Sequence, residues 1–124
     1  MIVENKTIIL VESWEPMRKF IRETIKTING VIIEKEFDGI ESVKKHLVSS
    51  DASILICEIP ANSERKVFDA IRQIKAIKPE IKIILSTLTY SKKLEEEAKR
   101  YGADRIWQKE ISEKYFLDQL KSVL

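Results

Sequence analysis

Cysteine, histidine, glycine and proline are all scarce in this chain, and the first two shortages exclude whole classes of protein. The single cysteine cannot form an internal disulfide, and it excludes a zinc site built from cysteines. The single histidine, His46, lies on a predicted helix, far along the chain from any strand end where a cysteine nucleophile would need a base. No apolar run reaches the roughly 20 residues that span a bilayer, and the N-terminus lacks the basic-then-apolar order of a signal peptide. We therefore expect a cytoplasmic protein with no membrane partner.

Neither sign of charge dominates the sequence. The 22 basic and 20 acidic residues leave a net charge of +2, which indicates no nucleic-acid partner. Apolar residues make up 44% of the chain and charged residues 34%, as is typical of a globular protein. At 124 residues the chain is long enough for one domain with a substantial core.

Five predicted strands alternate with five predicted helices along the chain. The central strand, residues 53–60, begins with four apolar or small residues in a row, which is typical of a strand buried on both faces of a parallel sheet. Strand–helix alternation favours right-handed βαβ units, and five of them are most simply arranged as a doubly wound, flavodoxin-like parallel sheet. The predicted strands are 7–11, 31–37, 53–60, 81–85 and 105–108, and the predicted helices are 15–28, 40–47, 65–77, 92–101 and 113–124.

Polar side chains and the cysteine lie at or just beyond the carboxyl ends of four of the five predicted strands. In an open α/β sheet the carboxyl ends of the strands frame the ligand site, so we expect these side chains to converge on one crevice. Acids, hydroxyls and an ammonium around one position suit an anion, a phosphoryl group or a metal-bridged carboxylate. The strand-end residues are Glu12, Ser13, Cys57, Glu58, Ser86, Thr87 and Lys109.

Five short sequence features, taken in order, resemble those of one known family. They are Ile8-Ile9-Leu10-Val11 before Glu12, Phe37-Asp38-Gly39 before a helix, Thr87 after the fourth strand, Tyr101-Gly102-Ala103-Asp104 before the fifth strand, and Lys109 after it. Together they resemble the receiver domain of response regulators, the phosphoacceptor module of two-component signalling, over residues 6–124. The resemblance implies a flavodoxin-like (βα)5 fold, with Thr87 as the switch hydroxyl and Lys109 as the lysine that contacts phosphate. It also implies a histidine kinase or an output protein as partner.

The chain departs from the receiver pattern at the acidic positions. A working receiver has two adjacent acids after the first strand and an aspartate after the third, which together hold Mg²⁺ and accept the phosphoryl group. Here the first pair is Glu12-Ser13, and the acceptor position is best matched by Cys57, with Glu58 as a second candidate because the following loop is a residue shorter. A thiol is a poor ligand for Mg²⁺. We therefore expect no cofactor, with Glu12 at most a weak Mg²⁺ ligand.

These departures predict a degenerate receiver that acts by protein–protein contact and not as an enzyme. We expect residues 1–124 to form a single receiver-like domain, because the end at Leu124 leaves no room for an attached output domain. Its partner would then be a signalling protein or a second copy of the chain. Tyr90 and Trp107 lie near the expected docking region around the fourth helix and fifth strand, and with Trp14 they are candidate contact residues.

Two alternatives remain open at this point. The domain could still accept a phosphoryl group through Glu58 or Cys57 with the help of Mg²⁺. It could instead be a small enzyme with Cys57 as its nucleophile, a hypothesis weakened by the lack of a nearby histidine. Within the leading prediction of a contact protein, Glu58 could act as a permanent substitute for a phosphorylated aspartate by pairing with Lys109.

Overall fold

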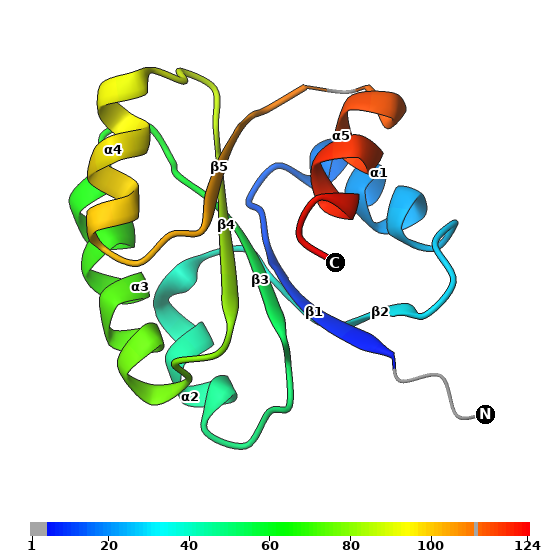
Figure 1. Ribbon diagram of the computed structural model, residues 1–124, viewed down its shortest axis with the longest axis horizontal. Coiled ribbons are helices and arrows are strands. Elements are labelled where there is room, and N and C mark those ends of the chain that lie inside the picture. Colours follow the sequence, from blue (N-terminus) through cyan, green and yellow to red (C-terminus); the bar gives the residue numbers. More distant parts are fainter. Residues whose placement is uncertain (1–4, 111) are drawn as a thin grey trace.

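The computed structural model describes residues 5–110 and 112–124, and they form the predicted alternation of strands and helices (Figure 1). Five strands and five α-helices are present in this part of the chain, with a short 3-10 helix, η1, before α2. The elements are β1 (Lys6–Val11), α1 (Glu15–Ile25), β2 (Val31–Phe37), η1 (Ile40–Ser42), α2 (Val43–Leu47), β3 (Ile54–Glu58), α3 (Glu64–Ile77), β4 (Lys82–Thr87), α4 (Lys92–Arg100), β5 (Arg105–Gln108) and α5 (Glu113–Lys121).

The five strands form one parallel sheet in the order β2-β1-β3-β4-β5. This order confirms the predicted doubly wound, flavodoxin-like sheet. β3 is the central strand and all five of its residues are buried, as its apolar run predicts. Within residues 5–110 and 112–124, no helix combines the length and apolar character needed to cross a membrane.

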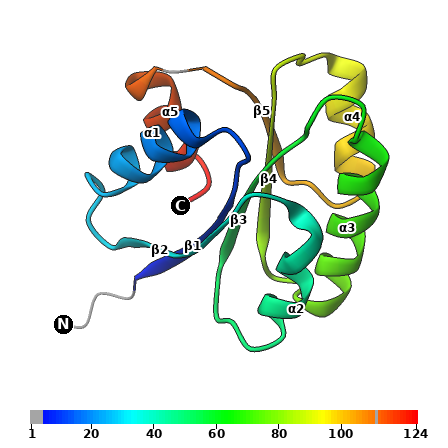
Figure 2. The same cartoon turned by 180° about the vertical axis from the view of Figure 1, so that it is seen from behind.

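Helices cover both faces of the sheet, and each face holds its own apolar cluster. α1 and α5 lie on one side, while α2, α3 and α4 lie on the other (Figures 1 and 2). Side chains of a strand point alternately to opposite faces, so consecutive strand residues enter different clusters. Ile54 and Ile56 pack with α1 and α5, whereas Leu55 and Cys57 pack with α2, α3 and α4. The same alternation determines the face of the sheet to which each side chain at the carboxyl edge points.

Side-chain caps and one glycine mark several of the helix ends. Ser112 caps α5, because its side chain accepts a hydrogen bond from the backbone N–H of Tyr115. Gly102 follows the last turn of α4 with a φ of 114°, a conformation that favours glycine. Ser13 does not cap α1: the cap position is Trp14, which makes no side-chain capping bond.

Candidate functional site

Glu12, Glu58 and Lys109 extend from the carboxyl ends of β1, β3 and β5 to one point. Each lies two positions beyond a strand residue that faces α1 and α5, so the alternation sends all three side chains to that face. The residues two positions earlier are Leu10, Ile56 and Trp107. Because β1 and β3 are hydrogen-bonded neighbours, the two carboxylates lie close together. Lys109 comes from the other side of the crevice.

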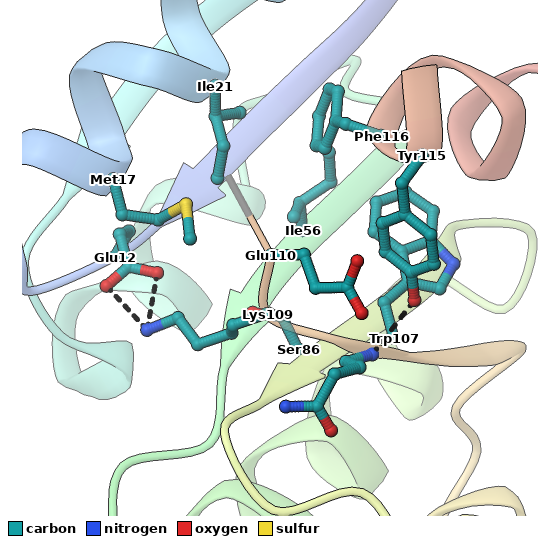
Figure 3. Close-up of a pocket in the computed structure, with 11 residues that line it drawn as sticks. Glu12, Met17, Ile21, Ile56, Ser86, Trp107, Lys109, Glu110, Tyr115 and Phe116 are labelled. Atoms are coloured by element: carbon teal, nitrogen blue, oxygen red, sulfur yellow. Dashed lines mark hydrogen bonds and ion pairs between the residues drawn. The ribbon is translucent and has the colours of Figure 1, made fainter. Parts of the chain in front are cut away.

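A buried ion cluster joins these three side chains. Nζ of Lys109 donates a hydrogen bond of 2.8 Å to Oε2 of Glu58 and one of 2.9 Å to Oε2 of Glu12. Figure 3 shows the lysine beside both carboxylate oxygens of Glu12. The exposed fractions of the Glu12, Glu58 and Lys109 side chains are 1%, 6% and 7%, so water contributes little to their solvation. The cluster holds two carboxylates for one ammonium and therefore carries one net negative charge when both acids are ionised.

Backbone donors occupy further carboxylate oxygens of the cluster. The N–H of Ser13 donates a 2.7 Å hydrogen bond to Oε1 of Glu58, and the N–H of Trp14 donates one of 3.0 Å to Oε2 of Glu12. The guanidinium of Arg18 donates to the carbonyl oxygen of Glu12 at 2.9 Å. Both oxygens of Glu58 are thus held by fixed donors of the protein.

The two acids of the cluster ionise very differently. Burial, together with the neighbouring Glu58, raises the pKa of Glu12 from 4.5 to about 6. Burial alone would also raise the pKa of Glu58, but hydrogen bonds involving Glu12, Lys109 and Ser13 lower it to about 2. Burial works against the charge of Lys109, yet its hydrogen bonds to the two glutamates raise the pKa of the ammonium. Glu12 is therefore the acid that takes up a proton first.

Cys57 lies in the opposite cluster, although it is adjacent to Glu58 in sequence. It is 0% exposed and its Sγ donates to the carbonyl oxygen of Glu58 at 3.3 Å. Burial raises the pKa of the thiol, and the negative charges of Glu58 and Glu12 raise it further. Of the two candidates for the acceptor position, Glu58 is the one whose side chain reaches Lys109.

Thr87 ends β4 near the crevice but its hydroxyl is engaged elsewhere. The side chain is buried, and Oγ1 accepts a 3.1 Å hydrogen bond from the N–H of Thr89. β3 and β4 pair Glu58 with Ser86, and alternation sends Thr87 to the other face of the sheet. The Thr87 hydroxyl and the Glu58 carboxylate are not hydrogen-bonded to each other within the described part of the chain.

The aromatic contact candidates divide into buried and exposed residues. Trp107 was predicted as a contact residue, and this is wrong for an exposed anchor: the side chain is 3% exposed and packs edge-on against Phe116 with ring centres 5.6 Å apart. The cause is alternation, because Trp107 continues the α1–α5 face of β5 and not the outer surface. Tyr90 is 44% exposed and Trp14 is 52% exposed.

Gln108 is a structural contributor that the sequence reading missed. Its amide Nε2 donates to the carbonyl oxygen of Leu88 at 2.7 Å, and its Oε1 accepts from the N–H of Tyr90 at 3.0 Å. Its own backbone N–H donates to the hydroxyl of Tyr115 in α5 at 3.1 Å, drawn as a dashed line in Figure 3. One side chain thus ties the loop after β4 to β5. No sequence pattern marks a glutamine for this role.

The donor set does not fit Mg²⁺. This ion prefers near-octahedral coordination by oxygens whose lone pairs are free, and the Glu58 oxygens already accept from Lys109 and Ser13. At the second acidic position Ser13 brings no carboxylate, and its backbone N–H points at Glu58. Among residues 5–110 and 112–124 no cluster of three acidic, histidine or cysteine side chains could hold a metal ion.

The sheet order, the helices on both faces and the acids and lysine at the carboxyl edge define the fold of a response-regulator receiver domain. The isolated receiver domain of RcsB from Salmonella enterica serovar Typhimurium, solved with the phosphomimetic BeF3−, has 20% sequence identity and a TM-score of 0.82. The match covers 97% of this chain and 88% of that one.

Two other response regulators have the same fold. One from Thermotoga maritima has 15% identity and a TM-score of 0.82, with 96% of this chain and 97% of that chain covered. HP1043, an orphan response regulator of Helicobacter pylori, has 15% identity and a TM-score of 0.80, with 94% of each chain covered. The chain spans 60% of a longer RcsB structure from Salmonella typhimurium. No family model and no curated protein matches the sequence, and identities this low establish the fold alone.

Proposed function

We propose that this chain is a receiver domain of the two-component signalling class that has given up phosphoryl transfer and works through protein–protein contact. The observation that carries the proposal is the buried cluster in which Lys109 binds Glu58 and Glu12 at 2.8 and 2.9 Å. The carboxylate beside the lysine is a glutamate held on both oxygens, and the second acidic position is Ser13.

Phosphoryl transfer needs positive charge around the transferring group and a carboxylate oxygen that is free to attack. Here the one buried ammonium is already shared between two carboxylates, and the donor set does not fit Mg²⁺. A dianionic phosphoryl group placed beside Glu12 and Glu58 would meet two like charges with no cation left to neutralise it. This balance favours a protein that is not an enzyme and requires no cofactor.

Glu58 supplies the charge that a phosphorylated aspartate would supply to Lys109. We infer that this permanent pair holds the crevice in one conformation, which a signalling protein or a second copy of the chain recognises. The Thr87 hydroxyl accepts a hydrogen bond from Thr89. Glu58 therefore resembles a phosphorylated aspartate in its pairing with Lys109 and not in a contact with Thr87. The alternative of a Cys57-dependent enzyme finds no support, because the thiol is buried away from Lys109 and its pKa is raised.

Intact mass spectrometry after incubation with acetyl phosphate and Mg²⁺ tests the loss of phosphoryl transfer. We expect no phosphoryl adduct on the wild type, with an active receiver domain in the same donor solution as positive control. The double variant Ser13→Asp, Glu58→Asp restores an acid pair and a shorter acceptor at the crevice. An adduct on the variant alone would localise the loss to these two positions, whereas an adduct on the wild type would refute the proposal.

Sedimentation equilibrium of the wild type and Glu58→Gln tests the contact part of the proposal for the homodimer. Glutamine keeps the size of the side chain but removes the charge that pairs with Lys109. We expect weaker self-association of Glu58→Gln. Self-association that is the same in both proteins would contradict a role for the Glu58–Lys109 pair in presenting the contact surface.

A further inference from the structure

Three loops at the carboxyl edge of the sheet surround a hollow with mainly apolar walls, which adjoins the pocket drawn in Figure 3 and shares Met17 and Lys109 with it. We call it the crevice-mouth hollow and define it by its wall residues Trp14, Ile59, Pro60, Ala61 and Leu88. Trp14 comes from the loop before α1, and Leu88 from the loop after β4. Glu58 and Lys109 also line it.

Two of the wall side chains are unusually exposed for their size and chemistry. Trp14 is 52% exposed and Leu88 is 70% exposed. Large apolar side chains grouped around a concave surface mark interaction sites more often than scattered ones do. The loop that carries Leu88 is held by Gln108, whose amide binds the backbone on both sides of Thr89. The wall is therefore fixed in place and needs little ordering when a partner binds.

Acidic groups dominate the charge around the hollow. Glu64, at the first turn of α3, lines the hollow and makes no ion pair within the described residues. The buried cluster beneath adds one net negative charge. In the part of the chain that the structure describes, Lys109 is the one cation that lines the hollow and is already shared by Glu12 and Glu58, whereas Arg65, next to Glu64 in sequence, donates to the hydroxyl of Tyr101.

We propose that the crevice-mouth hollow docks a partner segment that carries a bulky apolar side chain beside lysine or arginine. The apolar side chain would lie between Trp14 and Leu88, and the basic side chain would pair with Glu64. This inference rests on the proposed function, which requires contact with another protein, and it adds the chemistry of that partner. The negative charge at the hollow is local, because the chain as a whole has a net charge of +2.

This opposition between local and overall charge gives a sharp test. Two synthetic amphipathic peptides share the same leucine face and carry lysine in one case and glutamate in the other at every polar position. Non-specific attraction to a protein of net charge +2 would favour the glutamate peptide. We expect the lysine peptide to bind the whole protein at least about tenfold more tightly, with affinity falling as salt is raised. Amide shift changes in ¹H–¹⁵N spectra should concentrate at Ser13–Met17, Ile59–Glu64 and Thr87–Tyr90.

Matched variants separate the apolar and the charged contributions. Leu88→Ser is expected to weaken the lysine peptide about tenfold, the loss that follows from one buried leucine side chain. Val48→Ser changes a side chain that is also 70% exposed but lies at the end of α2, and should leave binding unchanged. Glu64→Gln should weaken binding and flatten its salt dependence. Glu80→Gln, which changes an exposed acid before β4, should do neither.

Equal binding of the two peptides, binding of neither, or shift changes elsewhere on the protein would overturn the proposal. Self-association that buries the same residues would overturn it as well, because the occupant would then be a second copy. The titrations contain no phosphodonor, so their outcome is independent of the mass-spectrometry test. A phosphoryl adduct would refute the proposed function, whereas failure of the peptide titration refutes only the identity of the partner.

Discussion

Replacing Lys109 by methionine removes the only ammonium from a cluster of two buried carboxylates. Methionine keeps most of the length and apolar surface of the lysine side chain, so packing changes little. Glu12 and Glu58 are then left 1% and 6% exposed without their shared cation. Removing one partner of a buried ion pair costs about 3–5 kcal/mol, because the remaining charge has no water to solvate it.

The pKa values of the two acids set the pH dependence in the wild type. Because the pKa of Glu12 is raised to about 6, this residue contributes about 2 kcal/mol to the free energy of unfolding below pH 4.5. That contribution is lost as the pH rises through 6. A pKa of about 2 for Glu58 means a contribution of about 3 kcal/mol that is present above pH 4.5 and is lost as the pH falls through 2. Well above pH 6 both acids are ionised, so the cluster adds little further slope there.

In Lys109→Met the pKa of each acid rises, because the hydrogen bonds from Lys109 lower both. The folded variant then holds a proton that the unfolded chain has released. Its free energy of unfolding therefore falls, as the pH rises, by up to about 1.4 kcal/mol per pH unit for each such proton. Urea unfolding, followed by far-UV circular dichroism at pH 6.5 and pH 8, measures the difference from the wild type. We expect this deficit to be larger at pH 8 by up to about 2 kcal/mol.

Lys114→Met is the matched control. Lys114 also pairs with a carboxylate, Asp118, at 2.8 Å, but the two side chains are 88% and 60% exposed. Water solvates both groups, so the control should lose little stability at either pH. A Lys109→Met deficit that is the same at pH 6.5 and 8, or no larger than that of the control, would refute the reasoning from burial.

Three further predictions concern other parts of the molecule. Cys57 should react with iodoacetamide at pH 8 only as fast as the protein opens, and rapidly in urea, since the thiol is buried with a raised pKa; fast alkylation of the folded protein would contradict its placement. Gly102→Ala should lower the unfolding free energy by about 1–3 kcal/mol, because φ is 114° and an added Cβ would lie 3.0 Å from Cγ of Lys75; unchanged urea midpoints would argue against this strain. Ser112→Ala should cost about 1 kcal/mol by removing the hydrogen bond to the N–H of Tyr115, while Ser112→Thr retains most of it in the same assay.

The sequence predicted the fold well because its signals were local and consistent. The unbroken apolar run of β3, the helical spacing between strands and Gly102 after α4 each point to the same arrangement. The boundaries moved by a few residues: β3 covers Ile54–Glu58 instead of 53–60, and α1 ends at Ile25 instead of 28. Helix ends of this kind fray into turns, and the polar residues there carry no strong stop signal.

The site was harder to predict, because it depends on which face each strand-end residue occupies. The sequence favoured Cys57 for the acceptor position and kept Glu58 as a second candidate, although alternation from the apolar residues of β3 sends them to opposite faces. The same rule would have marked Trp107 as buried. The pairing of Lys109 with both glutamates needed the distances between strands, which no single-sequence pattern contains.

The ion cluster also bears on how the chain avoids misfolding. A slip of β3 by one residue against its neighbours would turn the Glu58 carboxylate into the apolar side of the sheet, where α3 offers only Val67, Phe68, Ile71 and Ile74, and would bring the Cys57 thiol to Lys109 instead. The misregistered chain would bury an unpaired carboxylate, and Lys109 would keep Glu12 as its partner but lose Glu58. Strands made almost entirely of isoleucine and leucine specify their alignment weakly by themselves. In this protein the charged residues at the strand ends oppose such a slip, because the observed register is the one that brings Glu58 to Lys109.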